Sequence, residues 1–94
     1  MRICEVIGKV TLSRCHPSLR GMTWRIVVPL DRDGLRDHSQ GRGEPFITFD
    51  ELGSGDGSIV AISEGGEAVA PFYPEEKPID AYCAALLDTI ELQA

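Results

Sequence analysis

Residues 2–12 alternate between apolar and mixed positions with the two-residue period of a β-strand. The apolar positions form one face, which consists of Cys4, Val6, Val10 and Leu12. We expect this face to point into a core, and the opposite face, with Ile3 and Ile7, to be half covered. Gly8 interrupts the inward face and predicts a bend or β-bulge of the kind that curves a long strand in a small barrel. The segment is therefore predicted to be the first strand.

The alternation is clearest in residues 22–30, which are predicted to form the second strand. The more apolar face consists of Met22, Trp24, Ile26, Val28 and Leu30. The opposite face consists of Thr23, Arg25, Val27 and Pro29. Because Trp24 lies on the apolar face, we expect its side chain to pack in the core rather than to serve as a ligand platform.

Two short apolar runs, residues 45–50 and 58–63, predict the third and fourth strands, and they enclose a loop with Gly53, Gly55 and Gly57. A phosphate-binding loop would continue with a Lys-Ser or Lys-Thr pair, whereas Ser58 and Ile59 follow here. A dinucleotide-binding loop would continue into a helix, whereas the segment that follows is strand-like. The loop is therefore predicted to be architectural, with glycines that let two backbones pass closely.

The remaining segments are less regular. Residues 31–44 are the most polar part of the chain and predict a functional protrusion or a mobile hairpin tip. Asp31 and Asp33 resemble the start of a calcium loop, but the later ligands are out of register, so no calcium site is expected. Residues 63–70 predict a turn that leads into about one helical turn. Residues 82–92 fit the period of a helix and that of a strand, and periodicity alone leaves both open.

Four strands and a possible fifth, joined by polar loops, predict a mainly β fold, a small five-stranded OB-like β-barrel. A chain of 94 residues is expected to form a single domain, 1–94. A domain of this size buries only about 60–65% of its unfolded surface, so its stability is marginal unless something supports it.

Charge and cysteine content narrow the range of functions. The 15 acidic and 9 basic residues give a net charge of −6, which opposes binding to nucleic acid or to an anionic membrane. No apolar run approaches the ~20 residues of a membrane span and no signal peptide is apparent, so a cytoplasmic location is expected. Cys4, Cys15 and Cys83 are odd in number and widely spaced, so neither a disulfide framework nor a zinc site is expected.

The best catalytic candidate is the pair Cys15 and His16. Adjacent residues of an extended loop point in opposite directions, so His16 is poorly placed to deprotonate Cys15. The carboxylates of the chain form no spaced pair with an orienting partner. We therefore expect no enzyme, with no catalytic residue, no cofactor and no metal ligand.

Several short motifs occur in a fixed order along nearly the whole chain. They are Met1-Arg2-Ile3, Gly8-Lys9-Val10, His16-Pro17-Ser18-Leu19-Arg20-Gly21, Val27-Val28-Pro29-Leu30-Asp31, Asp50-Glu51-Leu52-Gly53-Ser54-Gly55-Asp56-Gly57 and Pro78-Ile79-Asp80-Ala81. In this order they resemble the bacterial microcompartment vertex proteins, the pentamer-forming shell proteins of carboxysomes and of ethanolamine-utilisation and related compartments. The chain departs from the family pattern at Cys15, where a basic residue is usual, and at Ala68-Val69, where an Ala-Arg pair is frequent.

The resemblance implies a barrel with one short helix after strand four and with residues 82–92 as strand five. It implies a non-enzymatic role, in which five copies form a ring at the five-fold corner of a microcompartment shell in the cytoplasm. The implied partners are the chain itself, as a homopentamer, and hexameric or trimeric shell proteins. The implied assembly residues are His16, Pro17, Leu19, Gly21, Asp50, Gly53, Gly55, Gly57 and Asp80.

The barrel pattern alone leaves one alternative, a small OB-like binding module for nucleic acid or for a protein segment. Such a module needs exposed aromatic and basic residues on one strand face. Arg25 is the only basic residue in the predicted strands two to four, so the fold is expected without that ligand.

Overall fold

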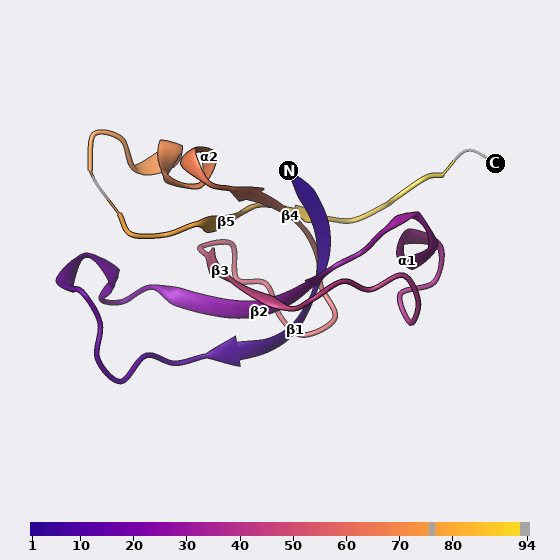
Figure 1. Ribbon diagram of the computed structural model, residues 1–94, viewed down its shortest axis with the longest axis horizontal. Helices are drawn as coiled ribbons and strands as arrows, with labels where there is room; N and C mark the ends of the chain where they lie inside the picture. Colours follow the sequence, from indigo (N-terminus) through magenta and orange to yellow (C-terminus); the bar gives the residue numbers. More distant parts are fainter. Residues whose placement is uncertain (76, 93–94) are drawn as a thin grey trace.

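The computed structural model describes residues 1–75 and 77–92 of the chain. Within these residues five strands form a closed barrel in the order β1-β2-β3-β5-β4 (Figure 1). The strands are β1 (Arg2–Val10), β2 (Thr23–Pro29), β3 (Phe46–Asp50), β4 (Ile59–Glu64) and β5 (Ala81–Leu87). β3 and β5 run parallel, and the other neighbouring strands pair antiparallel. The prediction of a mainly β, five-stranded barrel is confirmed.

Short helices occupy the connections between strands. They are η1 (Pro17–Leu19), α1 (Arg32–Arg36), α2 (Gly66–Val69) and η2 (Ala70–Phe72). The helical turn predicted after strand four is α2, and the C-terminal segment is a strand, as the resemblance implied, although β5 ends at Leu87 and not at residue 92. Figure 1 places α1 at one end of the molecule and the loops around η1 and η2 at the other end. Among the described residues no helix is long and apolar enough to span a membrane.

A β-bulge in β1 decides which side chains face the barrel interior. The register between β1 and β2 shifts between Val6 and Gly8, which confirms the predicted bulge. Cys4 and Val6 lie in the inner core, but Val10 pairs with Trp24 and packs in a second cluster. The prediction that Val10 shares the inward face of Val6 is therefore wrong, because one inserted residue inverts the alternation beyond it.

The two apolar clusters lie on opposite faces of the sheet. The inner cluster consists of Cys4, Val6, Val27, Val60, Ile62, Ala81 and Cys83. The outer cluster consists of Trp24, Phe49 and Ile79, bordered by Val10, Leu19, Met22, Val69, Phe72 and Tyr82. Val27 is fully buried in the inner cluster, so the predicted orientation of the second strand is corrected. The face that is more apolar in sequence lies outside the barrel, and η1, α2 and η2 cover its end around Trp24 and Met22.

Aromatic rings hold the outer cluster together. The ring of Phe49 lies 5.7 Å from Trp24, 5.6 Å from Phe72 and 5.9 Å from Tyr82, measured between centroids. Tilted pairs at these distances each contribute about 0.5–1.5 kcal/mol beyond the area that they bury. Trp24 is 9% exposed, which confirms the prediction that it packs in a core.

Sequence analysis missed helix α1 within residues 31–44. Asp31 caps this helix, since its Oδ1 accepts a hydrogen bond from the backbone nitrogen of Gly34 at 3.0 Å. The chain then folds back, and the Asp31 nitrogen donates to the carbonyl of Gly41 at 2.8 Å. Arg42 pairs with Glu5 of β1 at 2.5 Å and fixes the segment to the barrel. Asp31, which only resembled the start of a calcium loop, therefore serves as a helix cap.

Candidate assembly site

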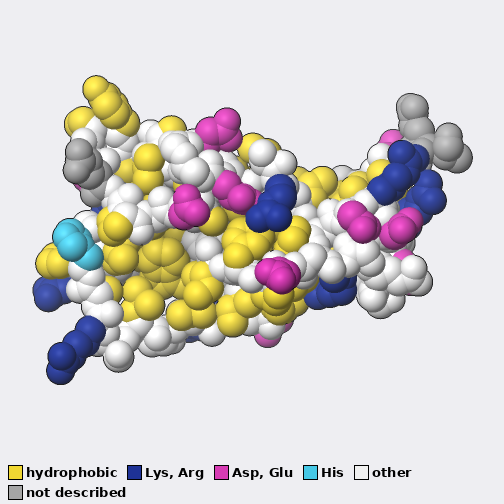
Figure 2. Space-filling model, in the orientation of Figure 1, with side chains coloured by type: hydrophobic (Ala, Val, Ile, Leu, Met, Phe, Trp, Pro, Cys, Tyr) yellow, Lys and Arg dark blue, Asp and Glu magenta, His cyan; other side chains and the backbone are white. Residues whose placement is uncertain are grey.

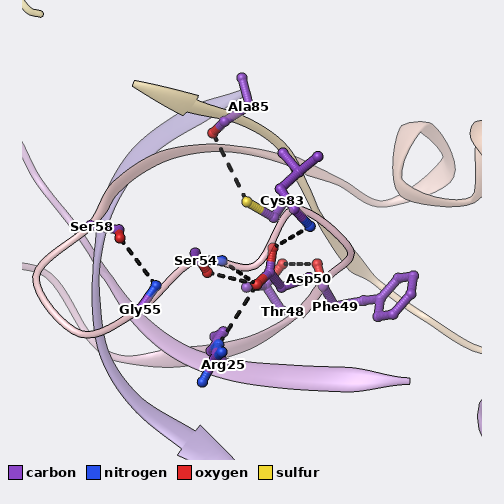
Figure 3. Close-up of polar contacts among 10 residues, drawn as sticks. Arg25, Thr48, Phe49, Asp50, Ser54, Gly55, Ser58, Cys83 and Ala85 are labelled. Carbon is purple, nitrogen blue, oxygen red and sulfur yellow. Dashed lines mark hydrogen bonds and ion pairs between the residues drawn. The ribbon is translucent and has the colours of Figure 1, made fainter. Parts of the chain in front are cut away.

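Asp50 organises the glycine-rich loop from the end of β3 (Figure 3). Asp50 is 3% exposed, and its Oδ2 accepts hydrogen bonds from the backbone nitrogen and the hydroxyl of Ser54, both at 2.8 Å. Its Oδ1 accepts from the Leu52 nitrogen at 3.0 Å, and Arg25 Nε lies 3.7 Å from Oδ2. One buried carboxylate thus folds residues 50–54 into a turn.

These donors keep Asp50 ionised. Burial of the carboxylate opposes ionisation, but the hydrogen bonds from Ser54 and Leu52, together with the Arg25 charge, hold the pKa of Asp50 below its usual range. Burial, and after it the Asp50 carboxylate, raises the pKa of the Cys83 thiol to about 12. At neutral pH the barrel interior therefore contains the ionised Asp50 carboxylate beside the Arg25 guanidinium, together with the neutral thiol of Cys83.

We expect Asp50 to make the fold sensitive to acid. Because its pKa in the folded state is below the value of about 3.9 for an unfolded aspartate, the ionised carboxylate stabilises the fold above that pH. This stabilisation is lost as the pH falls through the folded-state pKa. The urea midpoint should therefore drop less between pH 7 and pH 3 in Asp50→Asn than in the wild type. Asp56→Asn, at an exposed position of the same loop, serves as the control. An Asp50→Asn protein with the wild-type drop would contradict the expectation.

The glycines of the loop differ in what they require. Gly53 and Gly57 adopt φ values of +76° and +87°, in the left-handed region that favours glycine. Gly55 does not, and a Cβ added at any of the three would meet no atom within 4 Å. The prediction that these glycines let two backbones pass closely is therefore wrong for contacts within a single chain. Only contact with another molecule would require the small size of Gly55.

The end of the loop extends the pairing between β1 and β4. The Gly57 nitrogen donates to the Val6 carbonyl at 2.8 Å, and the Val6 nitrogen donates to the Ser58 carbonyl at 2.9 Å. The Gly55 nitrogen donates to the Ser58 hydroxyl at 3.1 Å (Figure 3). The loop is thus fixed to β1 beside the bulge.

The other predicted assembly residues lie mostly around η1. Pro17 and Leu19 belong to this helix, and His16 caps it because its Nδ1 accepts from the Ser18 nitrogen at 3.1 Å. The Nδ1 atom of His16 also lies 2.7 Å from the Ser18 hydroxyl oxygen. Gly21 follows with a φ of +77° and closes the turn.

The structure brings part of the predicted set together. Gly21, Asp50 and Gly53 line one depression of about 390 Å³. Leu19 and Gly21 also line a larger groove of about 760 Å³ beside the end of β1. Asp80 lines neither depression, and its carbonyl accepts a hydrogen bond from the Gly65 nitrogen at 2.9 Å.

A sequence profile of the family described as "Ethanolamine utilisation protein EutN/carboxysome" matches residues 1–88. The chain belongs to the EutN/CcmL family. This EutN/CcmL protein is 33% identical over 93 residues to the carboxysome shell vertex protein CcmL of Synechococcus elongatus, covering 99% of this chain and 89% of that relative. It is 30% identical over 91 residues to the microcompartment shell vertex protein GrpN of Rhodospirillum rubrum, covering 97% of each chain.

Solved structures of EutN/CcmL proteins share the fold over nearly the full length. The pentameric microcompartment shell protein GrpN of Rhodospirillum rubrum superposes with a TM-score of 0.81 at 28% identity, covering 99% of this chain and 100% of that one. CcmL of Gloeobacter violaceus superposes with a TM-score of 0.85 at 27% identity, covering 98% and 90%. The family resemblance predicted from the ordered motifs is confirmed. The assignment of individual assembly residues stays a prediction.

The site also contradicts the alternative of an OB-like module that binds nucleic acid. Trp24 and Phe49 are 9% and 5% exposed, so neither ring is available to stack on a base. Arg25 lies beside the buried Asp50 inside the barrel. These three strand residues of the EutN/CcmL protein therefore do not form the aromatic and basic surface that such a ligand needs.

Sequence analysis missed two features of the site. Arg25 and Asp50 meet in the barrel interior, and the spacing of Asp50 and Ser54 was the available signal, since aspartate commonly accepts from nitrogens a few residues ahead. Three cations, Lys9, Arg14 and Arg20, line the larger groove. Their positions in the sequence have no common period, so only the folded turn shows that they converge.

Proposed function

We propose that this protein is a shell vertex protein of a bacterial microcompartment and that it assembles as a ring of five copies. The observation that carries the proposal is the match over 97–99% of the chain to GrpN, whose structure is that of a pentameric microcompartment shell protein. Relatives from three other organisms, two CcmL proteins and one PduN protein, are also named shell vertex proteins. The role is structural, and no catalytic step is assigned.

The outer face of the barrel supports assembly. Ile47 of β3 is 52% exposed and pairs with Ile26 of β2, which in turn pairs with Gly8 of β1. Ile7, at the bulge, is 42% exposed. Figure 2 shows hydrophobic side chains gathered over the central part of the molecule. A small barrel with such a surface gains stability when copies of itself cover it, and a head-to-tail contact that closes forms a ring.

We further propose that each copy in the ring is a single domain, residues 1–94. The ring would contact hexameric and trimeric shell proteins of a microcompartment in the cytoplasm. A five-fold corner of a polyhedral shell must be surrounded by flat tiles. Five copies at −6 each carry a net charge of −30, which favours basic edges on those tiles.

Native mass spectrometry tests the ring directly. We expect five subunits of 10.2 kDa each. A strictly monomeric protein at micromolar concentration would overturn the proposal, and hexamers would remove the vertex role. Electron microscopy of shells produced with and without this chain should show closed corners only in its presence.

We expect Gly55→Val to impair the ring more than the fold. The added side chain meets no atom of its own chain, so the free energy of unfolding of the subunit should change by less than about 1 kcal/mol. A neighbour that packs on the loop would be displaced. Urea denaturation and native mass spectrometry measure the two effects on the same preparation. An assembled ring of normal stability would contradict the expectation.

A further inference from the structure

The connection between β1 and β2 forms a groove whose charge is opposite to that of the protein. The groove has a volume of about 760 Å³, and its lining includes the cations Lys9, Arg14 and Arg20 but no carboxylate. Its apolar lining consists of Val10, Leu12, Leu19 and Met22. A concave surface of this kind fits an apolar side chain that is flanked by negative charge.

The three cations of the groove form no ion pair with the described residues, whereas other cations do. Arg2 pairs with Glu64, Arg42 with Glu5 and Lys77 with Glu75. Figure 2 shows basic and histidine side chains at the end of the molecule that holds η1. In a protein of net charge −6, this local excess of positive charge favours a negatively charged partner from outside the chain.

The segment 66–75 has the complementary character. Tyr73 is 87% exposed, the largest exposed fraction among the large apolar side chains of the described residues. Glu67 and Glu75 are exposed on the same segment. Tyrosine is enriched at protein interfaces because it combines a large apolar ring with a polar tip. We refer to residues 66–75 as the acidic loop.

The groove and the acidic loop are placed so that each copy can use both at once. Figure 1 shows the turn around η1 and the loop after η2 one below the other at the same end of the molecule. Lys77 Nζ donates to the Ser18 carbonyl at 2.9 Å and fixes one relative to the other. The groove and the acidic loop are two different patches of one copy. A contact between two different patches is head-to-tail, and repeated head-to-tail contacts can close into a ring.

We propose that in the ring the acidic loop of each copy docks in the β1–β2 groove of the next copy. Tyr73 lies against the apolar lining, and Glu67 and Glu75 face Arg14 and Arg20. This inference rests on the proposed ring and names the segment of the neighbouring copy that completes the groove. The carboxylates also offset the three cations of the groove, Lys9, Arg14 and Arg20.

A native thiol in the groove allows a direct test. Cys15 lines the groove, and Tyr73→Cys places a second thiol at the tip of the acidic loop. Cys4 and Cys83 are buried, and burial raises their pKa values to about 11 and about 12, so they stay unreactive thiols near pH 8. Mild oxidation of Tyr73→Cys should give covalent oligomers of two to five chains on a non-reducing denaturing gel. Cys15→Ser in the same chain should abolish them, and Ser39→Cys, at the α1 end, should give none.

The outcomes separate this inference from the proposed function. A ring of five in native mass spectrometry whose Tyr73→Cys chains do not cross-link overturns the docking and leaves the ring intact. Oxidised Tyr73→Cys chains that lose both thiols but migrate as monomers would contain an intramolecular disulfide. That result would place residue 73 beside the groove of its own chain, which also overturns the docking. A wild-type protein that forms no ring overturns the proposed function itself.

Charge reversal gives a second test. Arg14→Glu should raise the protein concentration needed for half-assembly by about tenfold or more. Arg36→Glu, which makes the same charge change on α1, should leave that concentration within about twofold. Glu67→Arg in the Arg14→Glu chain should restore assembly. Equal effects of Arg14→Glu and Arg36→Glu, or no restoration by Glu67→Arg, would overturn the docking.

Discussion

Asp50→Ala should lower the free energy of unfolding by about 3–5 kcal/mol, because it removes the buried carboxylate around which the loop folds. The substitution leaves the Ser54 nitrogen, the Ser54 hydroxyl and the Leu52 nitrogen without their acceptor. It also leaves the Arg25 guanidinium in the barrel interior without its counter-charge. An unpaired donor costs about 1–3 kcal/mol, and an unpaired buried charge costs more. Urea denaturation followed by circular dichroism measures the loss.

The matched control for Asp50→Ala is Asp56→Ala, which removes an exposed carboxylate from the same loop and should change stability by no more than about 0.5 kcal/mol. Asp50→Asn keeps the shape of the side chain and should fall between the two. If Asp50→Ala were as stable as Asp56→Ala, the loop would be held by its backbone pairing with Val6 and not by the carboxylate.

Gly41→Ala should cost about 2–4 kcal/mol, the second large effect. Gly41 has a φ of +54°, where a Cβ is unfavourable. The added carbon would overlap Asp31 Oδ1 and lie 2.5 Å from the Gly34 nitrogen, so the cap of α1 could not form. Thermal or urea unfolding should show the loss of stability. Because the contact lies within one chain, the size of the loss should not depend on protein concentration.

Gly66→Ala is the control for Gly41→Ala. Gly66 lies in α2 with open space around it and without a positive φ, so alanine there should be neutral or slightly stabilising. A Gly41→Ala protein as stable as Gly66→Ala would show that α1 can move away from residues 40–41 without cost.

The strands could be predicted because each carries an apolar alternation that ends at polar or glycine-rich turns. Their orientation could not, because the bulge between Val6 and Gly8 reverses the faces of β1 and leaves Val10 beside Trp24. The alternation in β2 was real, yet residues of both faces are buried, Val27 in the barrel interior and Trp24 beneath η1, α2 and η2. Periodicity alone cannot distinguish two buried faces.

The parts of the site that were missed depend on contacts between distant residues. Helix α1 spans five residues and includes a glycine, so its propensity is weak, and its stability comes from Asp31, Gly41 and the pair of Arg42 with Glu5. The ordered motifs located the Asp50 loop and η1 correctly. They could not show that Asp50 is an internal anchor, because that role depends on the burial that the barrel provides.

The parallel contact of β3 with β5, where the barrel closes, links the stability of the subunit to contacts with neighbouring molecules. This contact has a single register pair, Phe49 with Tyr82, whereas β4 and β5 are paired along their length. At that seam the rings of Phe49 and Tyr82 meet Phe72 of η2, and the Tyr82 hydroxyl donates to Glu51 at 2.8 Å. Helix η2, which packs on the contact between β3 and β5, therefore belongs to the same connection as the exposed Tyr73. Whatever holds this connection in place from outside also makes opening of the barrel less favourable, so quaternary contact and barrel closure are thermodynamically linked.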